Sequence, residues 1–274
     1  MLVPTRETIT EADLEALRRA VRRLESPGFI ARVADYAGVP VEALLKRLPG
    51  GATNAIRQSV TAALGRCMDA ALFGFNRENW KFFKSESFSK AAVAVTGAGA
   101  GAFGLAALAV ELPLTTSLML RSIAEIAREE GEHVQSPEGR VACLEVLALG
   151  GRSTADDQAE IGYFAVRAAL AQEVSAAVRF LSTAADREAA PVIIRLLEAV
   201  AARFGIVVSE KAAAGAIPVI GAIGAATVNT LFMDHFQQMA HGHFAIRRLE
   251  RQHGPETIRR EYERCLSELK AGRP

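Results

Sequence analysis

Two long stretches of this chain carry no charged side chain and consist largely of alanine and glycine. Residues 91–110 are 20 uncharged residues, 13 of them Ala or Gly, and residues 212–233 are 22 uncharged residues, 10 of them Ala or Gly. As helices, both are long enough to cross a bilayer, and their small side chains let helix backbones approach closely. We therefore expect two Ala/Gly-rich helices that pack together. We call these stretches the first and second small-residue segments; they are bordered by Lys90, Glu111, Lys211 and Asp234.

Most of the remaining chain has helical periodicity. Leu14, Leu17 and Val21 recur at the spacing of an amphipathic helix, after an N-cap candidate at Thr10. Sustained alternation of apolar and polar residues and Asn-Gly turns, the signals of strands and hairpins, do not occur in the sequence. The sequence therefore predicts an all-α fold: a single multi-helix bundle of about ten helices, with the Ala/Gly-rich pair at its centre.

The helix boundaries follow from proline, glycine and capping residues. We expect one domain over residues 1–274, in which an N-terminal helix within residues 1–28 and a C-terminal helix within residues 255–274 are peripheral. Pro113 is expected to end the first small-residue segment, so that a new helix starts at Leu114. The other expected helices cover residues 10–24, 29–36, 41–49, 55–73, 114–130, 136–149, 156–184, 190–204, 234–252 and 256–270.

Composition argues against several classes of protein. The 32 basic and 31 acidic side chains give a net charge of +1, which provides no overall field to attract nucleic acid. Three well-separated cysteines (Cys67, Cys143 and Cys265) are typical of reduced thiols. The N-terminus reaches charged residues without an apolar region, so we expect no secretory signal and a cytoplasmic location. A mean hydropathy of +0.16 is slightly apolar and is compatible with membrane contact.

An aromatic and basic stretch precedes the first small-residue segment. Residues 73–90 hold six of the 17 aromatic side chains, together with three lysines. Aromatic rings beside lysines are typical of an anchor at a membrane surface. The alternatives are a loop that its aromatic side chains pin into the core, and a stacking surface for single-stranded nucleic acid. The candidate contact residues are Phe73, Phe75, Trp80, Phe82 and Phe83.

The small-residue segments have a packing face of their own. On a helix Gly97, Gly101 and Gly104 lie on one side, and Pro218 and Gly221 share a side of the second segment. These residues are candidate contacts with lipid, with an apolar ligand, or with each other inside a soluble bundle. The six larger apolar residues of the first segment favour insertion by only about 2 to 3.5 kcal/mol, so any membrane association is shallow or conditional.

Residues 99–104 also match the spacing G-x-G-x-x-G of dinucleotide-binding turns. That turn needs a βαβ unit and an acidic residue at the end of a second strand, and the following region is helical in pattern. The histidines are equally poor metal candidates, because His241 and His243 point to different faces of a helix and His133 follows a helix-ending glycine. We expect no metal and no cofactor.

Polar residues follow the first small-residue segment closely. Arg121, Glu125 and Arg128 share one helix face, where they either make ion pairs that orient the helix or close the polar end of a cavity. In the second case the protein binds an apolar or acyl-chain ligand, with Arg121 or Arg128 at its head group. A hydrolase with a carboxylate general base is a further alternative, although no nucleophile motif occurs. The candidate polar residues are Glu111, Arg121, Glu125, Arg128 and Glu138.

The order of short motifs resembles the bacterial EcsC family. The central block of that resemblance comprises Thr96, Gly97, Gly104, Glu111, Leu112, Pro113, Thr115, Arg121, Gly131, Pro137, Glu138, Cys143 and residues 148–150. A second block comprises residues 217–222, Asn229, Phe232 and residues 247–250. The family commonly has Asp before Leu-Pro, where Glu111 keeps the charge. The family takes its name from a gene that neighbours a bacterial ABC transporter. The resemblance implies a cytoplasmic, membrane-proximal protein, and it implies no catalytic residue.

We therefore expect a non-enzymatic protein at the cytoplasmic face of a bacterial membrane, acting by shallow or conditional lipid association. Its expected partners are membrane lipid or an apolar ligand, and a membrane protein such as an ABC transporter. The runner-up functions are the soluble ligand binder and the hydrolase.

Overall fold

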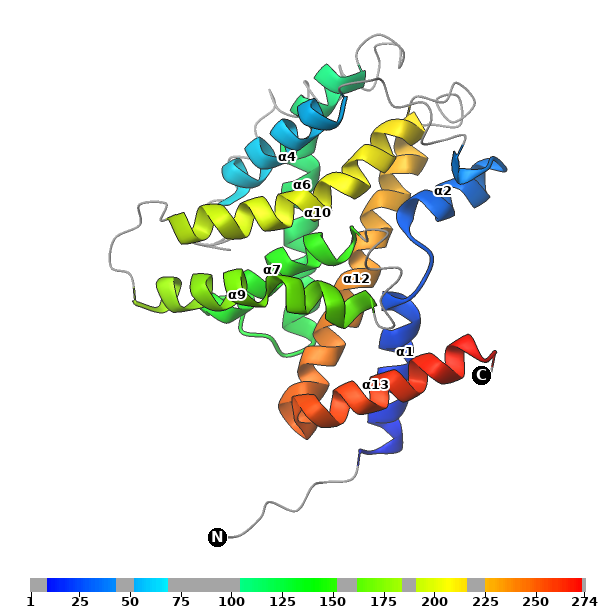
Figure 1. Ribbon diagram of the computed structural model, residues 1–274, viewed down its shortest axis with the longest axis vertical. Helices are drawn as coiled ribbons and strands as arrows, with labels where there is room; N and C mark the ends of the chain where they lie inside the picture. Colours follow the sequence, from blue (N-terminus) through cyan, green and yellow to red (C-terminus); the bar gives the residue numbers. More distant parts are fainter. Residues whose placement is uncertain are drawn as a thin grey trace.

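The computed structural model describes residues 9–42, 52–68, 104–151, 162–183, 191–215 and 225–272. Within these ranges the chain forms nine helices and no strand, so the all-α prediction is confirmed (Figure 1). The helices are α1 (Glu11–Leu24), α2 (Phe29–Ala37), α4 (Ala52–Met68), α6 (Gly104–Glu129), α7 (Pro137–Leu149), α9 (Gly162–Thr183), α10 (Pro191–Gly215), α12 (Ala225–His253) and α13 (Pro255–Lys270).

Local capping chemistry sets several helix ends where the sequence predicts them. The Thr10 side chain accepts a hydrogen bond from the Asp13 backbone N–H, which caps α1. Ser136 caps α7 in the same way through the N–H of Gly139. Gly38 ends α2 at a φ of 65°, in the left-handed region that favours glycine. These ends need only neighbouring residues, so they are readable from sequence.

The long helix α12 is the centre of the bundle. It runs along most of the molecule and contacts α1, α2, α6, α7, α10 and α13 (Figure 1). Phe232, Phe236 and Phe244 on α12 are fully buried. Phe232 and Phe236 lie with ring centroids 5.2 Å apart in an edge-to-face arrangement, which adds a directional contact to their apolar burial. The core is therefore organised along one helix.

A glycine on α12 lets α1 lie close to it. A Cβ atom at Gly242 would lie 2.5 Å from the Cγ atom of Leu24, which is closer than carbon atoms normally approach. Polar contacts hold the other end of α1, where Asp13 lies 3.0 Å from His253 Nε2 and 3.5 Å from Arg248. Contacts at both of its ends therefore hold α1 beside α12.

Helix α6 runs through Pro113 without a break, so the predicted helix end at this proline is wrong. A proline inside a helix costs about 3 kcal/mol because it lacks the N–H that would bond to the carbonyl four residues earlier. Here Leu112 and Pro113 are buried, and α4 packs along α6. Burial of this face outweighs the local cost. One consequence is that Glu111 lies inside a helix.

The structure describes only parts of the small-residue segments. The described part of the first segment begins at Gly104, which is the first residue of α6. The second segment supplies the end of α10, up to Gly215, and the start of α12, from Ala225, so its two described ends belong to different helices. The remaining candidate contacts lie outside the described residues: Phe73, Phe75, Trp80, Phe82, Phe83, Gly97, Gly101, Pro218 and Gly221.

Candidate functional site

An ion pair joins the inner borders of the two small-residue segments. Lys211 Nζ on α10 lies 2.6 Å from Glu111 Oε1 on α6 and donates a hydrogen bond to it. Glu111 directly follows the first segment, and Lys211 directly precedes the second. The pair therefore places the end of one uncharged segment beside the beginning of the other.

Lys211 is held in an apolar setting. Its side chain is 6% exposed, whereas that of Glu111 is 27% exposed. The Lys211 ammonium also lies 4.8 Å from the ring centroid of Phe232 on α12, a cation–π contact. Burial lowers the pKa of Lys211, and the charge and hydrogen bond of Glu111 oppose that shift. Three helices, α6, α10 and α12, thus converge on one ammonium group.

Around Pro113, side-chain hydroxyl groups donate hydrogen bonds to backbone carbonyl groups of α6. Ser117 Oγ donates a 2.7 Å hydrogen bond to the Pro113 carbonyl, and Thr115 Oγ1 donates a 3.1 Å bond to the Glu111 carbonyl. The Cys67 thiol of α4 lies 3.1 Å from Ser117 Oγ. Burial raises the pKa of the Cys67 thiol, so it is a thiol and not a reactive thiolate. This region is a packed helix junction that fixes Glu111.

The predicted polar residues do not come together with Glu111. Arg121 and Glu125 form an exposed ion pair, 3.0 Å long, on the surface of α6. Arg128 and Glu138 are exposed as well, the latter in the first turn of α7. The shared helix face of Arg121 and Glu125 is as predicted. Arg121 lies ten residues, about 15 Å, along α6 from Glu111, and Glu125 and Arg128 lie farther along it. The five residues therefore do not line one site.

The outer border of the second segment carries another ion pair. Asp234 on α12 pairs with Arg32 on α2 and accepts a hydrogen bond from Gln238. Although partial burial raises the pKa of Asp234, the hydrogen bonds from Arg32 and Gln238 lower it below its usual value. The Asp234 carboxylate therefore stays ionised and paired. Of the four border residues, the three that the structure describes each have a partner of opposite charge.

A buried polar cluster between α7, α9 and α12 was missed by the sequence reasoning. The Tyr163 hydroxyl and His243 Nδ1 lie 3.0 Å apart, and His243 Nε2 lies 4.0 Å from Glu145 Oε2. Burial lowers the pKa of His243 and raises that of Glu145, so both groups favour their neutral forms. Within the described ranges, no three His, Cys, Asp or Glu side chains are placed to hold a metal ion.

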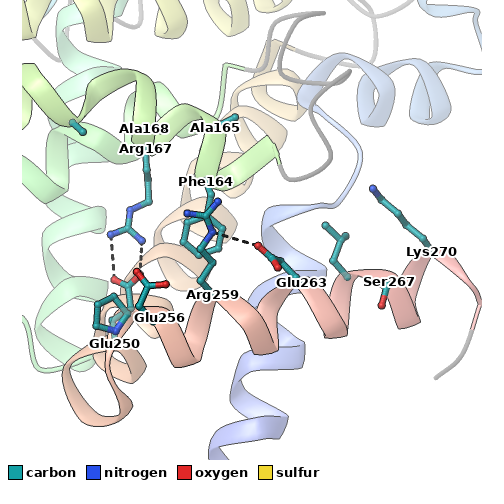
Figure 2. A pocket seen from close by; sticks show the side chains of 13 residues that line it. Phe164, Ala165, Arg167, Ala168, Glu250, Glu256, Arg259, Glu263, Ser267 and Lys270 are labelled. Carbon is teal, nitrogen blue, oxygen red and sulfur yellow. Dashed lines mark hydrogen bonds and ion pairs between the residues drawn. The ribbon is translucent and has the colours of Figure 1, made fainter.

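A groove of about 790 Å³ lies beside this cluster, between α9 and α13 (Figure 2). Arg167 and Glu250 form a two-hydrogen-bond ion pair there, with distances of 2.7 and 3.1 Å. Arg259 lies over the Phe164 ring and also bonds to Glu263 (Figure 2). Both arginines of the groove thus have a carboxylate partner within it.

Sequence reasoning treated Lys211 as no more than the border of a segment, and its pairing with Glu111 was not predicted. A usable signal exists, because each is the charged residue that borders a long uncharged stretch. No helix in the described part of the chain has both the length and the hydropathy that a bilayer crossing requires.

A family model described as the EcsC protein family matches residues 11–249. The match runs from the first residue of α1 almost to the end of α12, and it includes Glu111, Lys211 and Asp234. No curated protein and no solved structure matches the chain. Since the match covers most of the sequence, the chain belongs to the EcsC protein family.

Proposed function

We propose that this protein works without catalysis at the cytoplasmic face of a bacterial membrane. In this proposal the aromatic-lysine stretch of residues 73–90 enters the lipid surface together with residues 91–103 and 216–224, the parts of the two small-residue segments that lie between the described helices. The observation that carries the proposal is the Lys211–Glu111 ion pair, which brings the inner borders of both segments to one place on the folded bundle.

A hairpin that enters lipid must leave its charged borders behind. A charge at the centre of a bilayer costs about 2.5 to 3.5 kcal/mol on the insertion scale. Glu111 and Lys211 neutralise each other, and Asp234 is neutralised by Arg32. Each of these three border charges is therefore paired with an opposite charge on the folded helices. The residues between the borders carry no charge.

The energetics favour shallow and reversible entry. The larger apolar residues of the first segment contribute only about 2 to 3.5 kcal/mol, which a single misplaced charge cancels. Lysines at positions 81, 84 and 90 add attraction to anionic headgroups, about 1 kcal/mol for each charge close to the surface. We therefore expect binding to vesicles that contain anionic lipid, and weaker binding at high salt.

Flotation of the full chain with vesicles tests this function. The vesicles are phosphatidylcholine alone, or phosphatidylcholine mixed with phosphatidylglycerol. Wild type should float with the anionic vesicles, and the double variant Phe82→Ser with Phe83→Ser should stay at the bottom of the gradient. The matched control is Ile194→Ser with Leu269→Ser, which removes two exposed apolar side chains from α10 and α13. Equal flotation of both double variants would refute lipid entry through the aromatic stretch.

A further inference from the structure

The surface of the protein has a hollow of about 410 Å³ between α1, α2 and α12. Its lining is rich in guanidinium groups and comes from residues far apart in sequence. The lining residues are Arg19, Arg22, Arg23, Ser26, Pro27, Arg32, Asp234 and Gln238.

The hollow has an excess of positive charge. Four guanidinium groups face the Asp234 carboxylate, which is already engaged by Arg32 and Gln238. Outside the lining, Glu15 lies 3.4 Å from both Arg19 and Arg22. Among the described residues, two carboxylates therefore stand against four cations. Arg19 and Arg22 share one carboxylate, whereas Arg167 and Arg259 in the groove between α9 and α13 each have one of their own.

The arginines come from two helices that are fixed in place. Arg19, Arg22 and Arg23 share one face of α1, at spacings of three and four residues. The neighbouring Leu24 sits against Gly242, which holds this end of α1 on α12. Arg32 comes from α2 and is oriented by Asp234. The helices that bring these four arginines to the hollow are thus in place before any ligand arrives.

Helix dipoles explain only part of this arrangement. Arg22 and Arg23 lie in the last turn of α1, where a cation is favourable next to the helix C-terminus. Arg32 lies near the beginning of α2, where the helix dipole disfavours a cation. Its ion pair with Asp234 accounts for this position and brings Arg32 to the hollow that the arginines of α1 also line.

We propose that this hollow binds a phosphate group. Guanidinium groups recognise phosphate oxygens through paired hydrogen bonds, and the hollow offers four of them on two walls. The phosphate belongs either to an anionic lipid headgroup or to a small soluble phosphate compound. Assigning it to a lipid rests on the proposed function, whereas the phosphate site itself does not.

The test compares two double variants of the full chain. Arg22→Gln with Arg23→Gln removes two cations from the hollow. Arg195→Gln with Arg260→Gln removes two exposed cations from α10 and α13, which do not line it. Circular dichroism and the urea midpoint establish that each variant is folded. Titration calorimetry with inorganic phosphate forms the first arm, and flotation with phosphatidylglycerol vesicles forms the second.

Each result has a defined meaning. The proposal expects Arg22→Gln with Arg23→Gln to weaken binding about tenfold or more in at least one arm, while the control matches wild type. A loss confined to calorimetry identifies a soluble phosphate, and a loss in flotation identifies the lipid headgroup. If the two double variants behave alike in both arms, the phosphate site is refuted.

The same experiment separates this site from the proposed membrane function. Phe82→Ser with Phe83→Ser tests lipid entry, because it leaves every described lining residue of the hollow unchanged. Flotation that survives this variant would overturn lipid entry through the aromatic stretch. Wild type that fails to float but binds phosphate through Arg22 and Arg23 would overturn the membrane function and leave the phosphate site standing.

Discussion

Lys211 of α10 bonds to Glu111 of α6 across 100 positions of sequence, at a distance of 2.6 Å. The two residues are the inner borders of the small-residue segments. This contact connects a compositional feature of the sequence to a location on the fold. It also gives the charge at each inner border a partner of opposite sign.

Breaking this ion pair from one side should destabilise the protein. Glu111→Gln leaves the Lys211 ammonium, only 6% exposed, without its carboxylate. We expect the free energy of unfolding, measured with urea, to fall by about 1 to 3 kcal/mol. Lys211→Met should cost less, because Glu111 reaches water and methionine still packs on Phe232.

The double variant Glu111→Gln with Lys211→Met is the control for this prediction. If the two residues act as a pair, the double variant should lose less stability than the sum of the two single losses. Strict additivity would show that the contact contributes nothing specific to stability.

Two glycines inside helices should respond oppositely to alanine. Gly242→Ala brings a Cβ atom to 2.5 Å from Leu24 Cγ, so α1 must shift, and we expect a loss of about 1 to 3 kcal/mol. Gly205→Ala in α10 meets nothing within 4 Å, and should gain about 0.5 to 1 kcal/mol from its higher helix propensity. Equal melting temperatures for both variants would contradict the close approach of α1 and α12.

Acid should weaken the fold through His243. Burial, followed by the charges of Arg247 and Arg167, holds its pKa well below 6.5. Below pH 6.5 the unfolded chain therefore takes up a proton that the folded chain refuses, and stability falls by up to about 1.4 kcal/mol per pH unit. Glu145 acts in the opposite direction, because its raised pKa lets the folded state take up a proton first.

The prediction for His243 is therefore tested by comparing how the stability of wild type and of His243→Gln depends on pH. Urea unfolding of wild type and His243→Gln at a series of pH values gives the two slopes, with Glu145 present in both proteins. The stability of the variant should fall less steeply than that of wild type as the pH drops from about 6.5. Parallel curves would mean that His243 takes up its proton equally in the folded and unfolded chains.

Features set by neighbouring residues could be predicted from the sequence. The cap at Thr10, the stop at Gly38 and the start at Ser136 depend on backbone groups within a few positions. Helical periodicity also gave the all-α class. Pro113 shows the limit of such reasoning, because a local preference to end the helix is outweighed by burial against α4, a contact between distant residues.

The site depends on contacts that no local pattern specifies. Arg121 and Glu125 could be paired from their spacing, since a helix puts them on one face. Nothing in the spacing says that Glu111 meets Lys211 or that Arg32 meets Asp234. Such pairs are chosen by how the helices pack. The hollow that we assign to phosphate is of the same kind, because its two walls come from different helices.

The fluorescence of Trp80 tests the central claim most directly. It is the only tryptophan in the chain and lies in the aromatic stretch that we expect to enter lipid. Vesicles containing phosphatidylglycerol should shift its emission to shorter wavelength, and lipids with brominated acyl chains should quench it, because entry places the ring at the edge of the acyl chains. Emission that neither shifts nor is quenched in the presence of these vesicles would contradict entry into the membrane surface.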